Sequence, residues 1–421
     1  MAIGLAVALT GMPVLAADFF VDPDGSDSND GLAPQTPFAT IGRGAEALAN
    51  PGDRVIVAAG LYEEGDIAPA RGGGPGAAVQ LIGDREGSFT GRPGAVIVSP
   101  PAGVGTGFLV LGQVGVTIRG FEIVGGRDAG IQVRGARDGA GSADVTIRDC
   151  TIVASARHGI DITASGTVQL IGNLIADHAI GGIALAGGEE EPIVPFLSNN
   201  ILLDNGAGGS GHGIFIEGAA DGLLQNNEIA GSGLTGITIR GAERMRVVNN
   251  LIHRNGTGCA EGQVCGHGLA LGSASAAVLE AWVVNNTSYG NHGWGFLFGN
   301  DGAPSRGAVV LNNIFAGNLR GGVAVSRDST CGYIAAFNLN ADGYGPDTPF
   351  NLISMAIPGS STPRGATSAC ELLARAAPRR PSTPAVRLPA RSVLPVRRPP
   401  LRRWTLAGSI SASTPEPRPS R

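Results

Sequence analysis

The sequence has 421 residues, of which 68 are Gly and 43% are hydrophobic, and its formal net charge is −5. Gly is more than twice as frequent as its usual share of ~7%, but it follows no three-residue period, which excludes a collagen-like chain. We expect these Gly residues to serve turns. The hydrophobic share excludes a chain that is disordered over most of its length.

Residues 1–16, MAIGLAVALTGMPVLA, form an apolar run that ends in the small-residue pattern Val14-Leu15-Ala16. This pattern predicts a secretory signal peptide and a protein that is secreted or held in the cell envelope. No Lys or Arg precedes the run, so a buried first strand is the alternative interpretation. No later stretch is long and apolar enough to span a membrane.

Residues 17–52 contain a predicted first strand, the acidic loop DPDGSDSNDG at 22–31, and a segment from Thr36-Pro37 to Asn50 that predicts a short amphipathic helix. A solenoid needs a cover over its exposed end, and we expect this helix to cap it. The loop partly matches a calcium loop, although Pro37 stands where an EF-hand has its closing Glu. The candidate calcium ligands are Asp24, Asp27 and Asp30.

An Asn pair recurs along the middle of the chain, at steps of 23 to 36 residues. A self-similar period of this length predicts a solenoid. Asn is a poor strand former, but it tolerates the left-handed backbone of a sharp bend, and stacked Asn side chains can bond one another. We therefore expect one corner of each coil at Asn173, Asn200, Asn227, Asn250, Asn286, Asn313 and Asn338.

A second motif, Gly followed by apolar, any residue and apolar, occurs eight times between Gly130-Ile131-Gln132-Val133 and Gly322-Val323-Ala324-Val325. Its two-residue alternation predicts short strands with one buried face. Each repeat is too short for a crossover helix but long enough to circle once and stack on the previous one. Residues 53–345 are thus predicted to form a parallel β-helix, with at least eight coils between residues 115 and 340.

From FFVDPDGSDSNDG at residue 19 through the coil repeats, roughly residues 18 to 345, the chain resembles the secreted bacterial right-handed parallel β-helix proteins of the pectin lyase-like superfamily. The resemblance implies an all-β, right-handed parallel β-helix with a short N-terminal capping helix. The superfamily includes polysaccharide lyases, glycoside hydrolases, epimerases and proteins without known catalysis, so the resemblance leaves the reaction open.

The catalytic motifs of this superfamily are incomplete in the chain. Gly211-His212-Gly213 and CGHGLALGS at 265–273 are similar to the Gly-His-Gly of polygalacturonase-like hydrolases, but there is no adjacent Asp pair and no Lys. Glycoside hydrolysis requires two carboxylates at a defined separation. The absence of Lys also disfavours lyases with a Lys base, and the absence of Asp-Pro-His disfavours alginate-epimerase-like members.

Alternation places a set of polar residues on the outer side of the Gly-containing strands. One interpretation of this set is a sugar-binding groove with weak catalytic candidates. The other interpretation is that Glu217 and Arg240 form an ion pair between coils and the His residues cap turns. The catalytic candidates are His158, Asp161, His212 and Glu217, and the candidate binding residues are Arg134, Asp161, Glu217 and Arg240.

In an exported protein the five cysteines can oxidise. Cys259 and Cys265 flank a short loop and are predicted to form a disulfide. Cys331 and Cys370 are a second candidate pair, and Cys150 is expected to pack in the core as a small apolar residue.

Residues 346–421 form a C-terminal extension that loses the repeat. From 371 onward it contains eleven Arg, ten Pro and two Glu, a net charge of +9, so residues 1–370 carry −14. Two interpretations are open: a disordered basic anchor for the cell surface, or the product of a frameshift. The acidic body repels polyanions unless calcium bridges them.

These observations predict a secreted protein that binds, and by one interpretation processes, a polysaccharide along a lateral groove, as a lyase, hydrolase or epimerase. The alternative is a non-catalytic structural or adhesive β-helix protein of the cell envelope. Calcium is the one cofactor that we consider. We expect no nucleic-acid partner and a monomer.

Overall fold

The computed structural model describes residues 16–342, except positions 75, 136–143, 165, 189–190, 207–208, 210, 274, 300–303, 327–328 and 330–337. The predicted signal peptide, apart from its last residue, lies outside the described residues. So do residues 343–421, which include the predicted C-terminal extension from residue 346, and the candidate pair Cys331 and Cys370.

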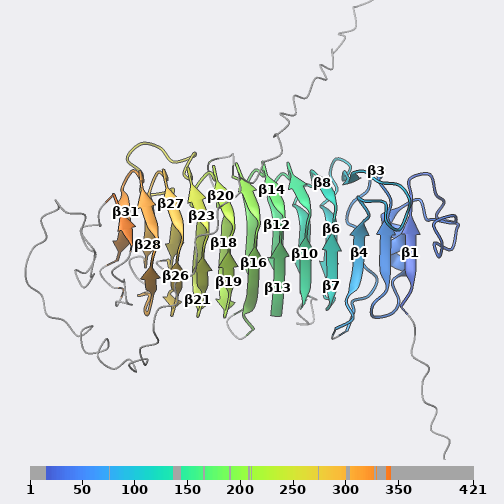
Figure 1. Ribbon diagram of the computed structural model, residues 1–421, viewed down its shortest axis with the longest axis horizontal. Coiled ribbons are helices and arrows are strands. Elements are labelled where there is room, and N and C mark those ends of the chain that lie inside the picture. The colour runs from blue at the N-terminus through green and yellow to red at the C-terminus, as the bar shows by residue number, and fades with distance from the viewer. Residues whose placement is uncertain are drawn as a thin grey trace, which may run out of the picture. The chain divides into compact units, whose positions relative to one another are not determined.

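The described chain is an all-β solenoid of short parallel strands, with three strands in a typical coil (Figure 1). Strands at the same place in successive coils pair in parallel and form three faces. Face 1 contains β1 (Asp18–Val21), β2 (Arg54–Val57), β4 (Val79–Gly83), β7 (Val116–Arg119), β10 (Val145–Arg148), β13 (Gly166–Ile171), β16 (Ile193–Ser198), β19 (Leu223–Gln225), β22 (Arg246–Val248), β26 (Trp282–Val284) and β29 (Val309–Leu311).

Face 2 follows the first corner of each coil. It contains β3 (Gly60–Tyr62), β5 (Val96–Val98), β8 (Glu122–Val124), β11 (Thr151–Val153), β14 (Leu174–Ala176), β17 (Ile201–Leu203), β20 (Glu228–Ala230), β23 (Leu251–His253), β27 (Thr287–Tyr289), β30 (Ile314–Ala316) and β32 (Leu339–Asn340).

Face 3 carries the Gly motif. It contains β6 (Thr106–Leu111), β9 (Ala129–Arg134), β12 (His158–Thr163), β15 (Gly181–Ala186), β18 (Ile214–Ala220), β21 (Ile237–Glu243), β24 (Leu269–Leu271), β28 (Trp294–Phe298) and β31 (Gly321–Val325). The two-residue strand β25 (Val278–Leu279) pairs with the end of β21, where the chain turns back toward face 1.

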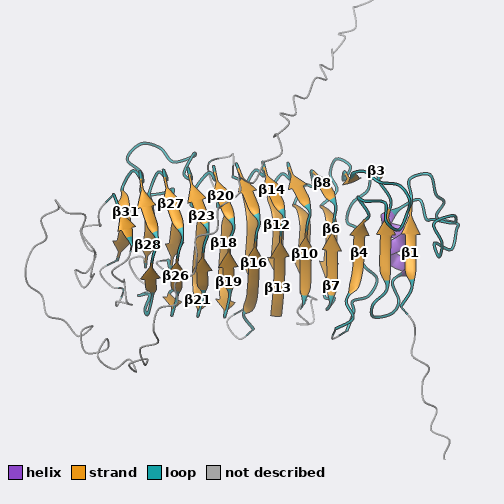
Figure 2. Ribbon diagram, viewed as in Figure 1, coloured by secondary structure: helices purple, strands orange, loops and turns teal. Residues whose placement is uncertain are grey.

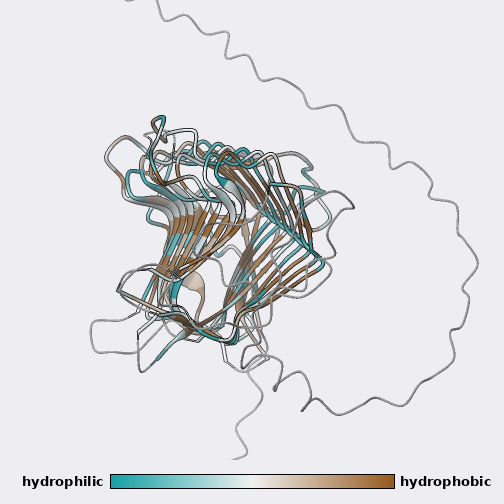
Figure 3. Cartoon of the chain, turned by 90° about the vertical axis from the view of Figure 1, so that its left-hand side faces the viewer, coloured by the Kyte–Doolittle hydropathy of each residue, from teal (hydrophilic) through white to brown (hydrophobic). Residues whose placement is uncertain are grey.

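The interior of the coils is a continuous apolar core. Inward residues such as Ile147, Ile152 and Ile160 are fully buried, whereas outward residues of the same strands, such as Thr146 and Asp161, are partly exposed. Viewed along the coils, hydrophobic segments follow the strands of all three faces (Figure 3). The two-residue alternation that predicts the strands thus reflects which side chains point inward. The predicted parallel β-helix, with its eight coils between 115 and 340, is confirmed.

The Gly that opens each motif is not a turn residue, contrary to our expectation. None of the eight motif glycines has a positive φ, whereas many others do, including Gly172 and Gly231. A Cβ on Gly130 would lie 2.3 Å from Ile152 Cγ2, and one on Gly213 would lie 2.4 Å from Ile229 Cγ2. The start of each face 3 strand therefore lies too close to the buried side chain of face 2 for any residue but Gly.

The Asn pairs form the corner between face 1 and face 2, as predicted. The first Asn of each pair has a left-handed backbone, with φ between 53° and 58°. The second is buried and joins a ladder: Asn227 donates from its backbone N and its Nδ2 to Asn250 Oδ1, at 3.0 and 2.9 Å, and from Nδ2 to the Leu197 carbonyl. The ladder runs unbroken from Asn173 to Asn338.

A second ladder, which the sequence analysis missed, forms the corner between face 2 and face 3. Asn255 N donates to Asn291 Oδ1 at 3.1 Å, and Asn291 N donates to Asn318 Oδ1 at 3.1 Å. Toward the N-terminus other side chains take the same place: Ser155 N donates to His178 Nδ1, and His178 N donates to Asn205 Oδ1. Both ends of face 2 are thus closed by buried side chains that satisfy backbone groups.

Helix α1 (Ile41–Ala47) lies beside β1 and β2 at the N-terminal end of the solenoid (Figure 2). Its buried residues Ile41 and Ala45 join the apolar core, as expected for a capping helix. Its N-cap is Thr40, whose side chain accepts from Arg43 N, so the helix begins later than the predicted Thr36-Pro37. In the described part of the chain we find no helix with the length and apolar character needed to cross a bilayer.

The ladder makes a direct prediction for stability. Replacing Asn227 with Ala leaves the buried Asn200 N and Leu197 carbonyl without their partners. We expect the free energy of unfolding, measured by urea denaturation, to fall by about 3 kcal/mol, the cost of one or two unsatisfied buried groups. The control is Asn226→Gly at the exposed left-handed position next to it, which should change little because Gly adopts this backbone freely. Equal effects of the two variants would contradict the ladder's role.

His178 makes a prediction for acid stability. Burial lowers its pKa to about 4, so the unfolded chain, with a His pKa of ~6.5, takes up the proton first. The protonation of His178 in the unfolded chain therefore lowers the free energy of unfolding as pH falls from ~6.5 to ~4. Asn205 holds the equivalent place in the next coil, so His178→Asn should keep the hydrogen bonds of the ladder. Because Asn does not titrate, this variant should lose less of its free energy of unfolding between pH 7 and pH 4.5. His292→Asn is the control, and an unchanged pH dependence in His178→Asn would refute the assignment.

Candidate functional site

The predicted site residues lie together on the outer side of face 3. Register places Gln132, Asp161, Ala184, Phe215 and Thr238 in one row along the solenoid. A second row, two residues further along each strand, contains Arg134, Thr163, Ala186, Glu217 and Arg240. Because coils are ~4.8 Å apart, the five coils of these rows span ~19 Å along the axis.

The first polar cluster is built around Asp161. Arg134 holds this carboxylate with both terminal nitrogens, one of them 3.2 Å from Asp161 Oδ1. Arg134 also donates to Thr163 Oγ1 at 2.7 Å, and Gln132 Nε2 lies 3.5 Å from Asp161 Oδ2. The Asp161 side chain is 18% exposed. This cluster is a fixed set of donors and acceptors with no net charge.

The second cluster lies two coils further on, around Phe215. Arg240 donates to Glu217 Oε2 at 3.0 Å, and its guanidinium lies over the Phe215 ring, 4.6 Å from the centroid. The His212 ring lies 5.5 Å from the same ring, and His212 Nδ1 lies 3.0 Å from Thr238 Oγ1. The ion pair between coils that the second interpretation expected is present, on the same face as the predicted groove.

Between the two clusters the coil of β15 presents small side chains, Ala184 and Ala186, together with Gly181. A Cβ on Gly181 would lie 3.0 Å from the His212 carbonyl and 3.2 Å from His158 Nδ1. The face is therefore a floor of small residues with a charged cluster at each end, and we name residues 132, 134, 161, 163, 184, 186, 215, 217, 238 and 240 the face 3 platform.

The His residues of this face are neutral in the ordinary pH range. Burial, with a smaller contribution from the charge of Arg240, lowers the pKa of His212 to about 4. Burial also lowers the pKa of His158, against the opposing charge of Asp161. An imidazole with so low a pKa is unprotonated but is a weak base, so these side chains are suited chiefly to hydrogen bonding.

The two carboxylates of the platform, Asp161 and Glu217, are held by different Arg residues. Asp161 and Glu217 are two coils apart, ~10 Å along the axis. Arg134 holds Asp161 from the preceding coil and Arg240 holds Glu217 from the following coil, so each carboxylate is bound on the side away from the other. Catalytic carboxylates of glycosidases lie ~5–9.5 Å apart with a substrate between them.

The three candidate calcium ligands each have a separate partner. Asp24 pairs with Arg92 at 2.7 Å, Asp27 accepts from the backbone of Ala39 and Thr40, and Asp30 accepts from Thr36 Oγ1. In the residues that the structure describes, we find no group of three or more His, Cys, Asp or Glu placed to hold a metal ion. These contacts connect the acidic loop to residues outside it.

Cys259 and Cys265, the pair indicated by the sequence, are joined by a disulfide with an S–S distance of 2.12 Å. The loop that they close is also held by Arg320, which donates to the Gly262 carbonyl at 2.6 Å. Cys150 is buried as a free thiol in the core, as predicted, and burial raises its pKa to about 11.

Comparison with known proteins agrees with this architecture. A family model described as the right-handed β-helix region matches residues 88–194 and 194–335. The chain belongs to the right-handed β-helix family. The handedness inferred from the sequence is therefore confirmed. A search of curated protein sequences found no match to this chain.

Solved structures share the fold at low sequence identity. A glycoside hydrolase is 11% identical, with 74% of this chain and 96% of that chain covered and a TM-score of 0.54. An alginate lyase from Paenibacillus sp. str. FPU-7 is 18% identical, covers 68% and 97%, and has a TM-score of 0.51. Pectate lyase Pel9A is 15% identical over 77% and 78%, with a TM-score of 0.46. At these identities the comparison shows the β-helix fold alone.

The protonation state of His212 can be measured. We expect its ring proton signals in NMR spectra to move with an inflection near pH 4, because burial opposes the charged form. His292, in the coil of β28, is a reference within the same protein. An inflection of His212 between pH 6 and 7 would show that the ring is solvated and would contradict the packing of this cluster.

Proposed function

We propose that this chain is a secreted β-helix protein that binds a polysaccharide along the face 3 platform. The observation that carries the proposal is the arrangement of two charge-neutral polar clusters around a floor of small side chains on one face. Sugar chains offer hydroxyl groups at regular spacing, and fixed carboxylate and guanidinium groups bind hydroxyls with charge-assisted hydrogen bonds.

The aromatic part of the platform supports the same ligand. Phe215 lies on the outer side of β18, and Arg240 covers part of its ring. An aromatic ring beside a guanidinium offers both an apolar surface and donors, which suits the apolar C–H faces and the hydroxyls of a pyranose. The fold of this family places such a surface on rigid strands rather than on loops, so binding requires little ordering.

The platform can be compared with the needs of two kinds of reaction, hydrolysis and proton abstraction. Hydrolysis by a carboxylate pair is disfavoured, because Asp161 and Glu217 are held apart by different Arg residues. Proton abstraction, as in a lyase or an epimerase, needs a single base, and the candidate is His212, which is oriented by Thr238; its pKa of about 4 leaves it unprotonated but makes it a weak base. We therefore propose binding as the function and a lyase or epimerase reaction as the form of catalysis to test. The alternative is a non-catalytic structural or adhesive protein.

The test is a binding screen of the purified protein against neutral and acidic polysaccharides, with and without calcium, followed by a variant of the platform. The triple variant Arg134→Ala, Asp161→Ala and Glu217→Ala should weaken binding of a polysaccharide found in the screen by about 10-fold or more, because each lost charged hydrogen bond costs ~1.5–3 kcal/mol. Circular dichroism should show that the fold is kept.

The matched control removes the same charges from the other faces: Arg148→Ala, Glu122→Ala and Glu228→Ala. This control should bind as the unchanged protein does. Equal affinity of the platform variant and the unchanged protein would exclude face 3 as the binding site, and no binding to any polysaccharide in the screen would favour the structural alternative. Loss of unsaturated or epimerised product in a His212→Gln variant would assign the base.

A further inference from the structure

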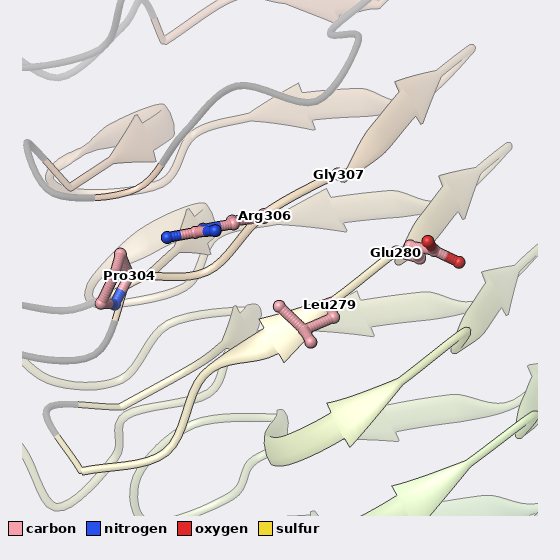
Figure 4. Close-up of a pocket in the computed structure, with 5 residues that line it drawn as sticks. All are labelled: Leu279, Glu280, Pro304, Arg306 and Gly307. Atoms are coloured by element: carbon pink, nitrogen blue, oxygen red, sulfur yellow. The ribbon is translucent and has the colours of Figure 1, made fainter.

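Away from face 3, two adjoining hollows lie at the corner where each coil enters face 1. The first, of about 500 Å³, is lined by Leu279, Glu280, Pro304, Arg306 and Gly307 (Figure 4). The second, of about 350 Å³, is lined by Asp221, Arg244, Arg246, Glu280 and Trp282. Glu280 lines both, so the two form one strip that crosses four coils, three steps of ~4.8 Å.

Trp282 is the feature that sets this strip apart. It is the first residue of β26, its side chain is on the outer side of face 1, and 54% of the residue is exposed. Register places Arg246 of β22 on one side of it and Val309 of β29 on the other. Trp is usually largely buried, and an exposed Trp on a rigid strand is a flat apolar surface that costs little entropy to bind.

Charged side chains next to Trp282 are unengaged. Within the described residues, the side chains of Arg246, Glu280 and Arg306 make no ion pair or hydrogen bond. The neighbouring Arg244 contrasts with them, because it holds Asp221 at 2.7 and 3.0 Å. Figure 4 shows Arg306 and Glu280 at opposite ends of their hollow. The strip therefore offers free donors and a free acceptor around an aromatic ring.

The backbone fixes these side chains in a column. Asp221, Arg244 and Glu280 stand at equivalent places of three coils and all have a left-handed φ, between 52° and 55°. Glu280 N donates to the Arg306 carbonyl at 2.9 Å, which ties the corner to the next coil. A left-handed non-Gly residue carries a cost that the surrounding structure must offset, so the corner holds each polar side chain at a defined place.

We propose that this strip is a second saccharide-binding site, separate from the face 3 platform. One pyranose ring stacks its C–H face on Trp282. Arg246 and Arg306 donate to hydroxyls or to a carboxylate of the adjoining sugars, and Glu280 accepts from a hydroxyl. A single aromatic ring among free charges is too polar and too narrow for a stable protein interface, which needs a larger closely packed patch.

Trp fluorescence gives a direct test, because the chain has three Trp residues and two can be replaced. In a Trp294→Phe, Trp404→Phe background, Trp282 is the remaining reporter. The probes are cellohexaose and xylohexaose as neutral chains and hexagalacturonate as an acidic chain. We expect at least one probe to shift the Trp282 emission in a saturable manner, and a Trp282→Ala variant to lower its affinity by about tenfold in calorimetry.

Two further variants identify the chemistry. Trp282→Phe should keep part of the affinity, since a smaller ring still stacks. The double variant Arg246→Ala, Arg306→Ala should weaken hexagalacturonate much more than the neutral probes if the sugar is a uronate, and all probes equally if it is neutral. Thermal unfolding of each variant should match that of the unchanged protein, because the replaced side chains are on the surface.

The result separates this site from the face 3 platform. Binding that survives the triple variant of face 3 but is lost in Trp282→Ala supports the second site, whatever the outcome for face 3. Emission of Trp282 that no probe changes, together with affinities that Trp282→Ala leaves unaltered, overturns it. Binding that is lost only in the face 3 variant also overturns it and leaves the function at the platform.

Discussion

The structure depends on buried side-chain amides that satisfy the backbone where the chain bends. In the ladder from Asn173 to Asn338, an Asn such as Asn227 donates to a carbonyl of the coil before it and to the Asn of the coil after it. These bonds exist only when successive coils are in register, so each bend fixes the position of the next. A one-residue slip would turn every inward Ile outward and break the ladder at once. Register and core are thus specified together.

This constraint determines where the chain tolerates extra residues. The step from Asn250 to Asn286 is longer than the others, and so is the step from Asn255 to Asn291, yet both ladders continue across it. The additional residues lie after Asn255: some are in the loop that contains the Cys259–Cys265 disulfide, and the rest are between β24 and β25, where the register with β21 shifts from Ile239↔Leu271 to Ala242↔Val278. The corner loops differ in length from coil to coil, whereas the strands of face 2 are nearly constant in length. Extra residues are thus accommodated in loops and not in strands.

The sequence was sufficient for the fold because its signals are local and repeated. Alternation identified the inward residues, and the Asn pairs identified one corner. The second corner escaped notice because its members differ in type, from Ser155 and His178 to Asn205, although each satisfies the same backbone groups. The motif Gly residues were assigned to turns, since a sequence does not show that Ile152 lies against Gly130. That contact joins residues from two different coils.

The candidate site was accessible from the sequence only in part. Alternation placed Arg134, Asp161, Glu217 and Arg240 on one face and indicated the Glu217–Arg240 ion pair, but the pairing of Asp161 with Arg134 follows from the direction in which the side chains lean. Trp282 carries no motif. Its surroundings, from Asp221 to Arg306, are spread over more than eighty residues and come together only through the stacking of four coils. A site of this kind is visible only once the register is known.

The near-identity of the coils has a consequence for how such a protein changes over generations. Because each coil contacts chiefly the one before and the one after, a duplication or loss of one repeat in the gene adds or removes a whole layer without a new kind of contact. A platform or strip that runs along the axis then lengthens by one layer, whereas its cross-section stays the same. A change in the number of coils can therefore alter the length of the ligand that is bound without altering the side chains that bind it.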